Sequence, residues 1–259
     1  MVCKAAMMAR IMFSIRQAIS HTWALIAVFL VWEIFVRVQG FNQIVLPSPA
    51  SVFASLIQDS DIYVDATIKT LWVSLAGLLI GATIGGIAAI IAWLSAFAAG
   101  FVSASAIVVR SVPFVVFVPV LATIMGYTNN MVITIVALMS FFPSFVLVSS
   151  GLTSLPSAAT DVSRVYGATP FRKLVYLALP AAASNWLASI RLSSSRAILA
   201  GMVAEFLTGI DGLGKLFLMA RADLKSEQAL GAAVIAAIAS LLLFYLAGLA
   251  EKMVNRRLS

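Results

Sequence analysis

Few side chains in this sequence could carry out catalysis. His21 and Cys3 are its only histidine and its only cysteine, so one chain cannot assemble a His-based metal site, a Cys-cluster metal site or a Ser-His-Asp triad. The run from Gly209 to Lys215 has nearly the spacing of a phosphate-binding loop. However, Leu216 occupies the position where Ser or Thr must hold magnesium, and no buried strand precedes the run. We therefore expect no catalytic residue, no metal site and no cofactor in this chain.

Two acidic residues within apolar stretches could instead serve transport. Glu33 is spaced i, i+4 from Arg37 and can pair with it. Glu205 lies near the end of a later apolar run, where an ionisable residue is a functional candidate by default and a charge partner on a neighbouring helix is the structural alternative. No acidic pair lies inside a span, so a membrane enzyme has no site. The candidates for lining a solute pathway are Ser140, Ser144, Ser194 and Glu205.

The composition is that of an integral membrane protein. Hydrophobic residues make up 62% of the sequence and charged residues 10%, against roughly 25% charged residues in a soluble domain. The net charge of +7 would suggest a nucleic-acid partner for a soluble chain. In a membrane protein the same excess is expected in cytoplasmic loops. We therefore expect membrane lipid around the chain and no nucleic acid.

Six apolar runs predict an all-α, polytopic membrane protein with six transmembrane helices. Residues 1–21 are expected to be a cytoplasmic N-terminal segment, because no small-residue cleavage site follows the basic start at a plausible distance. Residues 22–259 are expected to form a single transmembrane domain. Its expected spans are residues 22–38, 67–94, 111–127, 131–150, 186–207 and 229–250.

Two of these spans have features with specific consequences. Gly77, Gly81 and Gly85 fall near one face of the second helix, which favours close packing of another helix over a wider pore. Arg110 precedes the third span, and an arginine at the bilayer centre costs about 2.5 to 3.5 kcal/mol. We therefore expect the third span to start after Arg110, with Pro113 inside the helix.

The longest polar interruption in the second half is the stretch from Ser154 to Pro180. Ser154 is expected to cap a first short helix, and Gly167 to supply the left-handed residue that ends it. Thr169 is expected to cap a second helix that has Pro170 at its first position and ends before Pro180.

The first of these helices is predicted to be amphipathic. Its apolar side chains follow helical spacing and lie on one stripe, which needs a groove in the protein itself, in the lipid headgroups or in another protein. The pattern alone leaves all three open. The residues of the stripe are Leu155, Ala158, Ala159, Val162, Val165 and Tyr166.

The spacing in this loop resembles the signature loop of ABC importer permeases. In that family Glu-Ala-Ala is followed after three residues by Gly, and after nine more by Ile-x-Leu-Pro. The matching residues here are Asp161, Gly167 and the run Leu177 to Pro180, while Val162 and Ser163 stand at the two alanines. A second segment, Leu46 to Pro49 (Leu-Pro-Ser-Pro), is similar to the permeases for nitrate, sulfonates and taurine.

The resemblance implies a type I ABC importer permease fold. It also implies that the loop of residues 151–181 is a cytoplasmic coupling loop, seated in a cleft of an ATP-hydrolysing subunit. The residues assigned to this coupling are Asp161, Arg164, Tyr166, Gly167, Ala168, Thr169, Leu179 and Pro180.

The basic residues predict that both chain termini are cytoplasmic. Six spans place both termini on one side, and both termini are basic, as the positive-inside rule requires of cytoplasmic segments. The basic residues assigned outside are Arg37, Lys69, Lys215, Arg221 and Lys225. All others, Arg191 and Arg196 included, are assigned inside.

By resemblance, the chain is expected to be the permease subunit of an ATP-driven importer in the cell (inner or plasma) membrane of a prokaryote, working by alternating access. The expected cargo is a small solute, with nitrate, a sulfonate, taurine or a heterocyclic vitamin precursor left open. The implied partners are cytoplasmic ATP-binding subunits that hold ATP and magnesium, a periplasmic or lipid-anchored solute-binding protein, and a second permease copy in a homodimer. The alternative is a self-sufficient secondary transporter or channel, which would need intramembrane carboxylates.

Overall fold

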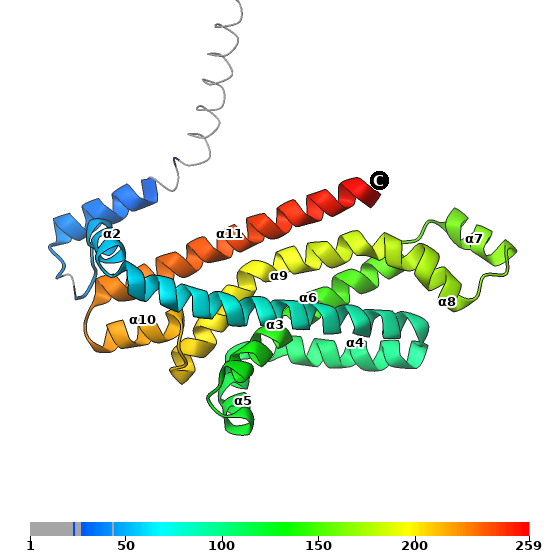
Figure 1. Cartoon of the computed structure of the whole chain (residues 1–259), viewed down its shortest axis with the longest axis horizontal. Helices are drawn as coiled ribbons and strands as arrows, with labels where there is room; N and C mark the ends of the chain where they lie inside the picture. The colour runs from blue at the N-terminus through cyan, green and yellow to red at the C-terminus, as the bar shows by residue number, and fades with distance from the viewer. Residues whose placement is uncertain (1–22, 24–26, 43, 259) are drawn as a thin grey trace, which may run out of the picture.

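The structure is a computed structural model that describes residues 23, 27–42 and 44–258 (Figure 1). The expected N-terminal segment of residues 1–21, with Cys3 and His21, lies outside the described residues, as does the start of the first expected span. Every regular element of the described part is a helix, which confirms the all-α prediction.

The helices follow one another through short connections. Residues 27–39 are helical. The later elements are α2 (Pro49–Gln58), α3 (Ser60–Leu94), α4 (Ala96–Ser111), η1 (Phe114–Val116), α5 (Phe117–Met125), α6 (Asn129–Thr153), α7 (Ser157–Val165), α8 (Pro170–Lys173), η2 (Leu174–Ala178), α9 (Leu179–Thr208), α10 (Leu213–Ala222) and α11 (Ser226–Leu258). Of the two short elements labelled η, η1 is a 3-10 helix and η2 a π-helix.

Four long helices, α3, α6, α9 and α11, run along the long axis of the molecule (Figure 1). Helix α6 packs against both α3 and α9, and α9 also packs against α11. The contact between α3 and α6 is close because glycines of α3 face it. A Cβ at Gly77 would lie 2.7 Å from the Ile133 carbonyl oxygen, and one at Gly81 would overlap with the Ala137 carbonyl. The expectation of close helix packing is therefore confirmed.

Three helices of the described part are long and apolar enough to cross a membrane: α3, α6 and α11. A fourth is added if the helical run Pro170–Thr208 and α10, which are bent by 45° at their junction, count as one span. The six expected spans are thus not all confirmed. The first run is described only in part, and the third is interrupted.

The third expected span, residues 111–127, is not one helix. Helix α4 ends at Ser111, Val112 is extended with φ −87° and ψ 128°, and a new helical segment begins after Pro113. The reason is local, because the residue before a proline is pushed out of the α region and proline cannot continue the helix hydrogen bonds. Pro113 precedes η1 and does not lie inside a helix, so the expectation that it does is wrong. The start of the third span after Arg110 stays a prediction.

The segment of residues 208–228, which follows the fifth expected span, packs against the bundle. Gly209 ends α9 in the left-handed region with φ 70°, and α10 then folds back against α9 and α11 with Leu213 and Ala220 buried. At the same end, the Tyr63 hydroxyl lies 2.9 Å from the Ser55 hydroxyl and donates to the Gln228 carbonyl at 3.1 Å. These contacts tie α2, α3 and α11 together.

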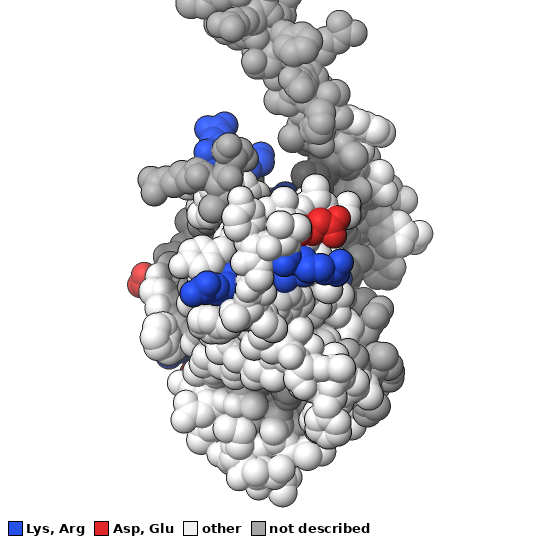
Figure 2. Space-filling view, turned by 90° about the vertical axis from the view of Figure 1, so that its right-hand side faces the viewer, with Lys and Arg blue, Asp and Glu red and all other residues white. Residues whose placement is uncertain are grey.

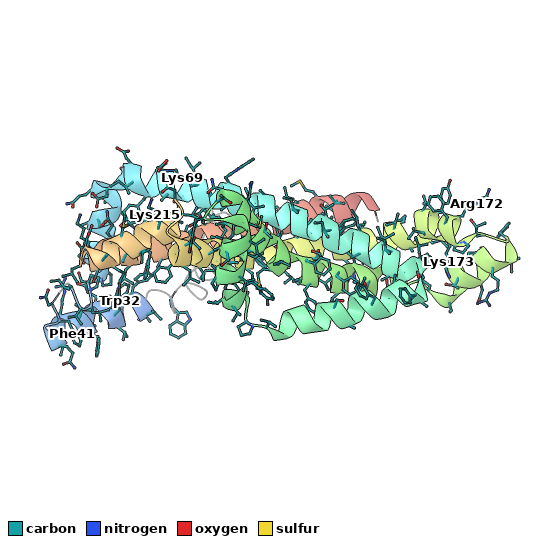
Figure 3. All side chains as sticks on the ribbon, turned by 90° about the horizontal axis from the view of Figure 1, so that it is seen from below. Trp32, Phe41, Lys69, Arg172, Lys173 and Lys215 are labelled. Atoms are coloured by element: carbon teal, nitrogen blue, oxygen red, sulfur yellow. The ribbon has the colours of Figure 1, made fainter. Side chains whose placement is uncertain are left out.

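Charged side chains mark the two ends of the bundle. Lys69 and Lys215 lie toward one end, and Arg172 and Lys173 lie at the other, beside α7 (Figure 3). We call the first the lysine end and the second the loop end. Between them the exposed side chains include many large apolar ones, such as Leu79 and Leu241, which are 56% and 68% exposed. An apolar surface of this kind suits lipid.

Candidate functional site

The loop between α6 and α9 forms the tip of the loop end (Figure 1). Helix α7 ends in a hydrogen-bonding pattern that favours glycine. Gly167 has φ 63°, its N–H donates to the Arg164 carbonyl at 3.0 Å, and the Ala168 N–H donates to the Ser163 carbonyl at 2.9 Å. These two bonds satisfy carbonyls that a helix end leaves free. The prediction that Gly167 ends this helix is confirmed.

The start of α8 also follows the prediction. Pro170 occupies its first turn, and the Thr169 hydroxyl accepts a hydrogen bond from the Arg172 N–H at 3.3 Å. A threonine before a proline favours the start of a helix for two reasons. The threonine hydroxyl accepts a hydrogen bond from a backbone N–H that has no partner within the helix, and proline has no N–H that needs one.

Two other expectations about this loop are wrong. Ser154 does not cap α7; its hydroxyl donates to the Gly151 carbonyl at 2.8 Å and closes α6, and α7 starts after Pro156. Pro180 does not end the second helix. The π-helical turn η2 carries α8 directly into α9 with Pro180 in the first turn of α9, because a π-turn shifts the hydrogen-bond pattern where proline has no N–H to give.

The amphipathic stripe of α7 is partly anchored and partly free. Leu155 packs against a buried cluster that contains Leu152, Leu174 and Ala178. Farther along, Val165 and Tyr166 are each 84% exposed. No described residue covers them, so the tip of the loop presents apolar side chains that the described part of the chain does not bury.

Among the charged side chains on the end surface around this tip, basic ones predominate (Figure 2). Figure 2 shows more Lys and Arg than Asp and Glu side chains there. The coupling candidates Asp161 and Arg164 are both exposed, with 3.9 Å between Oδ1 and Nη1, so this ion pair adds little stability. Leu179 and Pro180 lie at the root of the loop. The loop end thus combines the exposed apolar tip at Val165 and Tyr166 with basic side chains around it. We call these side chains, Arg172 and Lys173 among them, the basic rim (Figure 3).

The pathway candidates lie elsewhere, inside the bundle. Ser140, Ser144 and Ser194 are at most 1% exposed. Ser144 accepts a hydrogen bond from the Ser189 hydroxyl at 3.0 Å, and the Ser194 hydroxyl donates to the Arg191 carbonyl at 2.6 Å. The role of these serines in a pathway stays a prediction.

A family comparison decides the identity of the chain. Residues 81–259 match the family "Binding-protein-dependent transport system inner membrane component". The chain belongs to this family. Its members are non-catalytic membrane subunits of ABC transporters, and the ATPase is a separate partner.

Individual relatives agree with this family. The permease is 26% identical over 216 residues to a "Probable ABC transporter permease protein" of Haemophilus influenzae, covering 83% of this chain and 88% of the relative. It is 26% identical to the "Putative aliphatic sulfonates transport permease protein SsuC" of Bacillus subtilis, covering 82% and 77%. It is also 27% identical to the "Riboflavin transport system permease protein RibX" of Chloroflexus aurantiacus, covering 91% and 88%.

Solved structures show the same fold. An inward-facing MetNI methionine ABC transporter has a chain that matches with a TM-score of 0.65 and 19% identity, over 78% of this permease and 98% of that chain. A chain of an amino acid ABC transporter solved with histidines matches with a TM-score of 0.67 and 17% identity, over 78% and 98%. The prediction of an ABC importer permease fold is confirmed.

Glu205 of the permease has no charge partner of the expected kind among the described residues. Its side chain is fully buried, and Oε2 accepts hydrogen bonds from the Thr70 hydroxyl at 2.8 Å and from the Gly214 N–H at 3.0 Å. The Thr70 hydroxyl in turn accepts a hydrogen bond from the Leu213 N–H at 2.8 Å. Glu205 and Thr70 therefore cap the start of α10 and hold it against α3 and α9. We call this group the α10 clasp.

Replacing Glu205 with alanine is expected to destabilise the permease by about 2 to 4 kcal/mol. The substitution leaves the Gly214 N–H without its acceptor and opens a cavity in a packed core. Chemical unfolding of the purified protein in detergent measures the change. Glu205→Gln keeps a hydrogen-bond acceptor and should lose less stability than Glu205→Ala. Glu33→Ala is the control, because Glu33 is paired with Arg37 at 2.6 Å on the surface and such pairs contribute about 0 to 1 kcal/mol. Equal losses for Glu205→Ala and Glu33→Ala would contradict the clasp.

Sequence reasoning missed Thr70, although a signal was present. Thr70, Ser74, Gly77 and Gly81 are spaced along one face of α3, and all four are buried. Small and polar residues at helical spacing in an apolar run indicate a helix contact. The partner across the contact is 135 residues away in the sequence, which no local pattern reveals.

The lysine end of the permease carries a small cluster of ion pairs. Lys69 Nζ lies 2.6 Å from Asp65 and 3.8 Å from Asp211, and Lys215 Nζ lies 2.6 Å from Asp211. The hydrogen bond from Lys215 lowers the pKa of the Asp211 carboxyl. All four side chains are partly exposed, so the cluster orients the turn before α10 more than it stabilises the fold.

Two arginines, Arg191 and Arg196, lie within α9, and their assignment to the cytoplasmic side stays a prediction. Helix α9 begins at Leu179, well before both of them. The Arg191 Nη1 atom lies 3.2 Å from Glu251 of α11, and its guanidinium carbon lies 4.6 Å from the centre of the Phe244 ring. Arg196 is exposed. It lines a cavity of about 480 Å³ together with Pro113 and with Phe142 and Pro143 of α6.

Proposed function

We propose that this permease imports a small solute at the expense of ATP hydrolysed by a separate subunit, and that α7 is its coupling helix. The observation that carries the proposal is the exposed apolar tip at Val165 and Tyr166. An apolar, amphipathic helix end of this kind is suited to a groove on a partner protein. The basic rim around it favours a partner cleft with acidic residues.

The anchoring of α7 supports a mechanical role. Leu155, just before α7, shares a buried cluster with Leu152 at the end of α6 and with Leu174 and Ala178 of η2. The helical run Pro170–Thr208 continues from this cluster through the whole bundle. A displacement of α7 by a partner would therefore move α6 and α9 as packed units, because close-packed interiors transmit strain. Alternating access needs such a connection.

We infer from the same arrangement that the loop end is cytoplasmic. The exposed Arg172 and the half-buried Lys173 lie there, as the positive-inside rule requires. The lysine end would then face outward, where α2 and the turn before α10 offer a surface to a solute-binding protein. A second permease copy is proposed to complete the pathway, as a homodimer, in the inner membrane of a prokaryote.

The proposed solute is a small anion such as a sulfonate, taurine or nitrate. Relatives named for aliphatic sulfonates support this class, while other relatives are named for riboflavin and formylaminopyrimidine. Arg196 beside an apolar cavity in the permease also favours a negatively charged solute.

The test of this function is reconstitution. The permease is purified with the ATPase and solute-binding protein encoded beside it, and uptake into proteoliposomes is measured with and without ATP. The proposal expects uptake only when both partners and ATP are present. Uptake by the permease alone would show a self-sufficient transporter and overturn the proposal.

A further inference from the structure

We propose that Arg196 is the anion-binding residue of the solute pathway and that it contacts the solute in a cavity. This cavity is bounded by α6, by α9 and by the segment that follows the end of α4. This inference rests on the proposed import function and goes beyond it. It names the residue that makes the pathway favour anions and the place where the contact occurs.

Arg196 lies in the second half of α9. It lies nine residues before Glu205, or roughly 13 Å along the helix axis at 1.5 Å per residue. Charged residues are absent from the stretch between them. Arg196 is therefore well inside the apolar part of the bundle, and an arginine inside a membrane faces water, a partner or a ligand because lipid does not solvate it.

The ionisable residues of α9 differ in their contacts. Arg191 is paired with Glu251, and Glu205 is held by Thr70 and Gly214. Arg196 has no ion pair with any described residue, and its side chain is exposed at the cavity. Two of the three intramembrane charges are thus explained by contacts within the chain, and the third is not.

The cavity beside Arg196 has walls of low polarity. Apart from Arg196, the residues that line it are all apolar. Charges interact more strongly beside walls of low polarity than in water. An anion that enters gains from the guanidinium, whereas an uncharged solute gains only apolar contact.

The chemistry of the guanidinium defines the class of ligand. Its planar fork donates parallel hydrogen bonds to paired oxygens of a sulfonate, carboxylate or phosphate. A volume of about 480 Å³ is ample for a small organic anion. A lipid phosphate offers the same oxygens, so the experiment has to separate a mobile solute from a lipid headgroup.

The experiment measures uptake of radiolabelled ethanesulfonate and, as an uncharged probe, riboflavin by the reconstituted complex. Replacing Arg196 with glutamine is expected to reduce ethanesulfonate uptake about tenfold or more, because a charge-assisted contact is lost in a site of low polarity. Arg196→Lys keeps the charge and should retain a large part of the uptake. Arg221→Gln removes an exposed cation of α10 outside the cavity and should leave uptake unchanged.

A cysteine variant separates an electrostatic role from a structural one. In a Cys3→Ser background, Arg196→Cys is modified with a positively or a negatively charged methanethiosulfonate reagent. The positive adduct should restore ethanesulfonate uptake and the negative one should not. Ethanesulfonate in the medium should slow the modification; unchanged labelling would show that the site holds lipid or nothing, and would overturn the proposal.

The outcomes distinguish this inference from the proposed function. If the wild-type complex takes up ethanesulfonate in an ATP-dependent manner and Arg196→Gln does so equally well, the function stands and the role of Arg196 is rejected. If the wild-type complex takes up riboflavin but not ethanesulfonate, the anion pathway is rejected while import stands. If it takes up neither with ATP and both partners present, the proposed function and the inference fail together. An Arg196→Gln complex that does not assemble is resolved by the cysteine variant, which is tested before and after modification.

Discussion

Replacing Gly81 with leucine is expected to destabilise the permease by about 3 kcal/mol or more. A Cβ at Gly81 would overlap with the Ala137 carbonyl and lie 2.9 Å from the Ala137 Cα. These are backbone atoms of α6, so the clash cannot be relieved by rotating a side chain. The two helices would have to separate, and overpacking of this kind is costly.

The control for this prediction is Gly100→Leu. Gly100 lies in α4, and no described atom lies within 4 Å of a Cβ built there. Leucine forms helix more readily than glycine, so this variant should be as stable as the wild type or slightly more stable. The measurement is the unfolding midpoint of the purified protein in detergent. A Gly81→Leu protein as stable as Gly100→Leu would show that α3 and α6 do not pack as described.

The second large effect is expected at Gly167. We predict that Gly167→Leu lowers solute uptake about tenfold or more while the complex still hydrolyses ATP and the protein remains in the membrane. Gly167 has φ 63° and open space around it, so leucine clashes with nothing in the chain but strains the left-handed backbone that shapes the tip. It also adds bulk beside Tyr166, at the surface we propose to dock on the ATPase. Uptake and ATP hydrolysis are measured on the same proteoliposomes.

Two further variants make this result specific. Gly40 has φ 62° and is also open, and in the proposed orientation it lies away from the ATPase; Gly40→Leu should therefore leave uptake coupled to hydrolysis. Gly167→Asn tolerates the left-handed conformation and should keep more uptake than Gly167→Leu. Normal coupling in Gly167→Leu would count against docking at this tip.

The sequence was most informative where a structure depends on nearby residues. The Ser48 hydroxyl accepts a hydrogen bond from the Ser51 N–H at 3.2 Å at the start of α2, where Pro49 follows it. Thr169 and Gly167 also act as predicted. Each of these residues works through neighbours within three to five positions, so the composition of a short window is enough to identify it.

Predictions failed where two local signals compete or where distant segments meet. Ser154 can cap the helix after it or close the helix before it, and the extension of α6 to Thr153 decides for the latter. Pro180 predicts the end of a helix, but the π-turn before it allows the helix to continue. The clasp that joins Thr70 to Glu205 and the cavity beside Arg196 depend on which faces of α3, α6 and α9 meet, and tertiary packing determines that.

The most direct test of the account is whether the tip of α7 touches the ATPase subunit. A photo-crosslinker is attached to Val165→Cys in a Cys3→Ser background, and the complex is irradiated in membrane vesicles of known orientation. The account predicts a cross-link to the ATPase and reaction of the cysteine only from the cytoplasmic side. Labelling from the outer side, or an assembled complex in which the tip cross-links only to lipid, would contradict it.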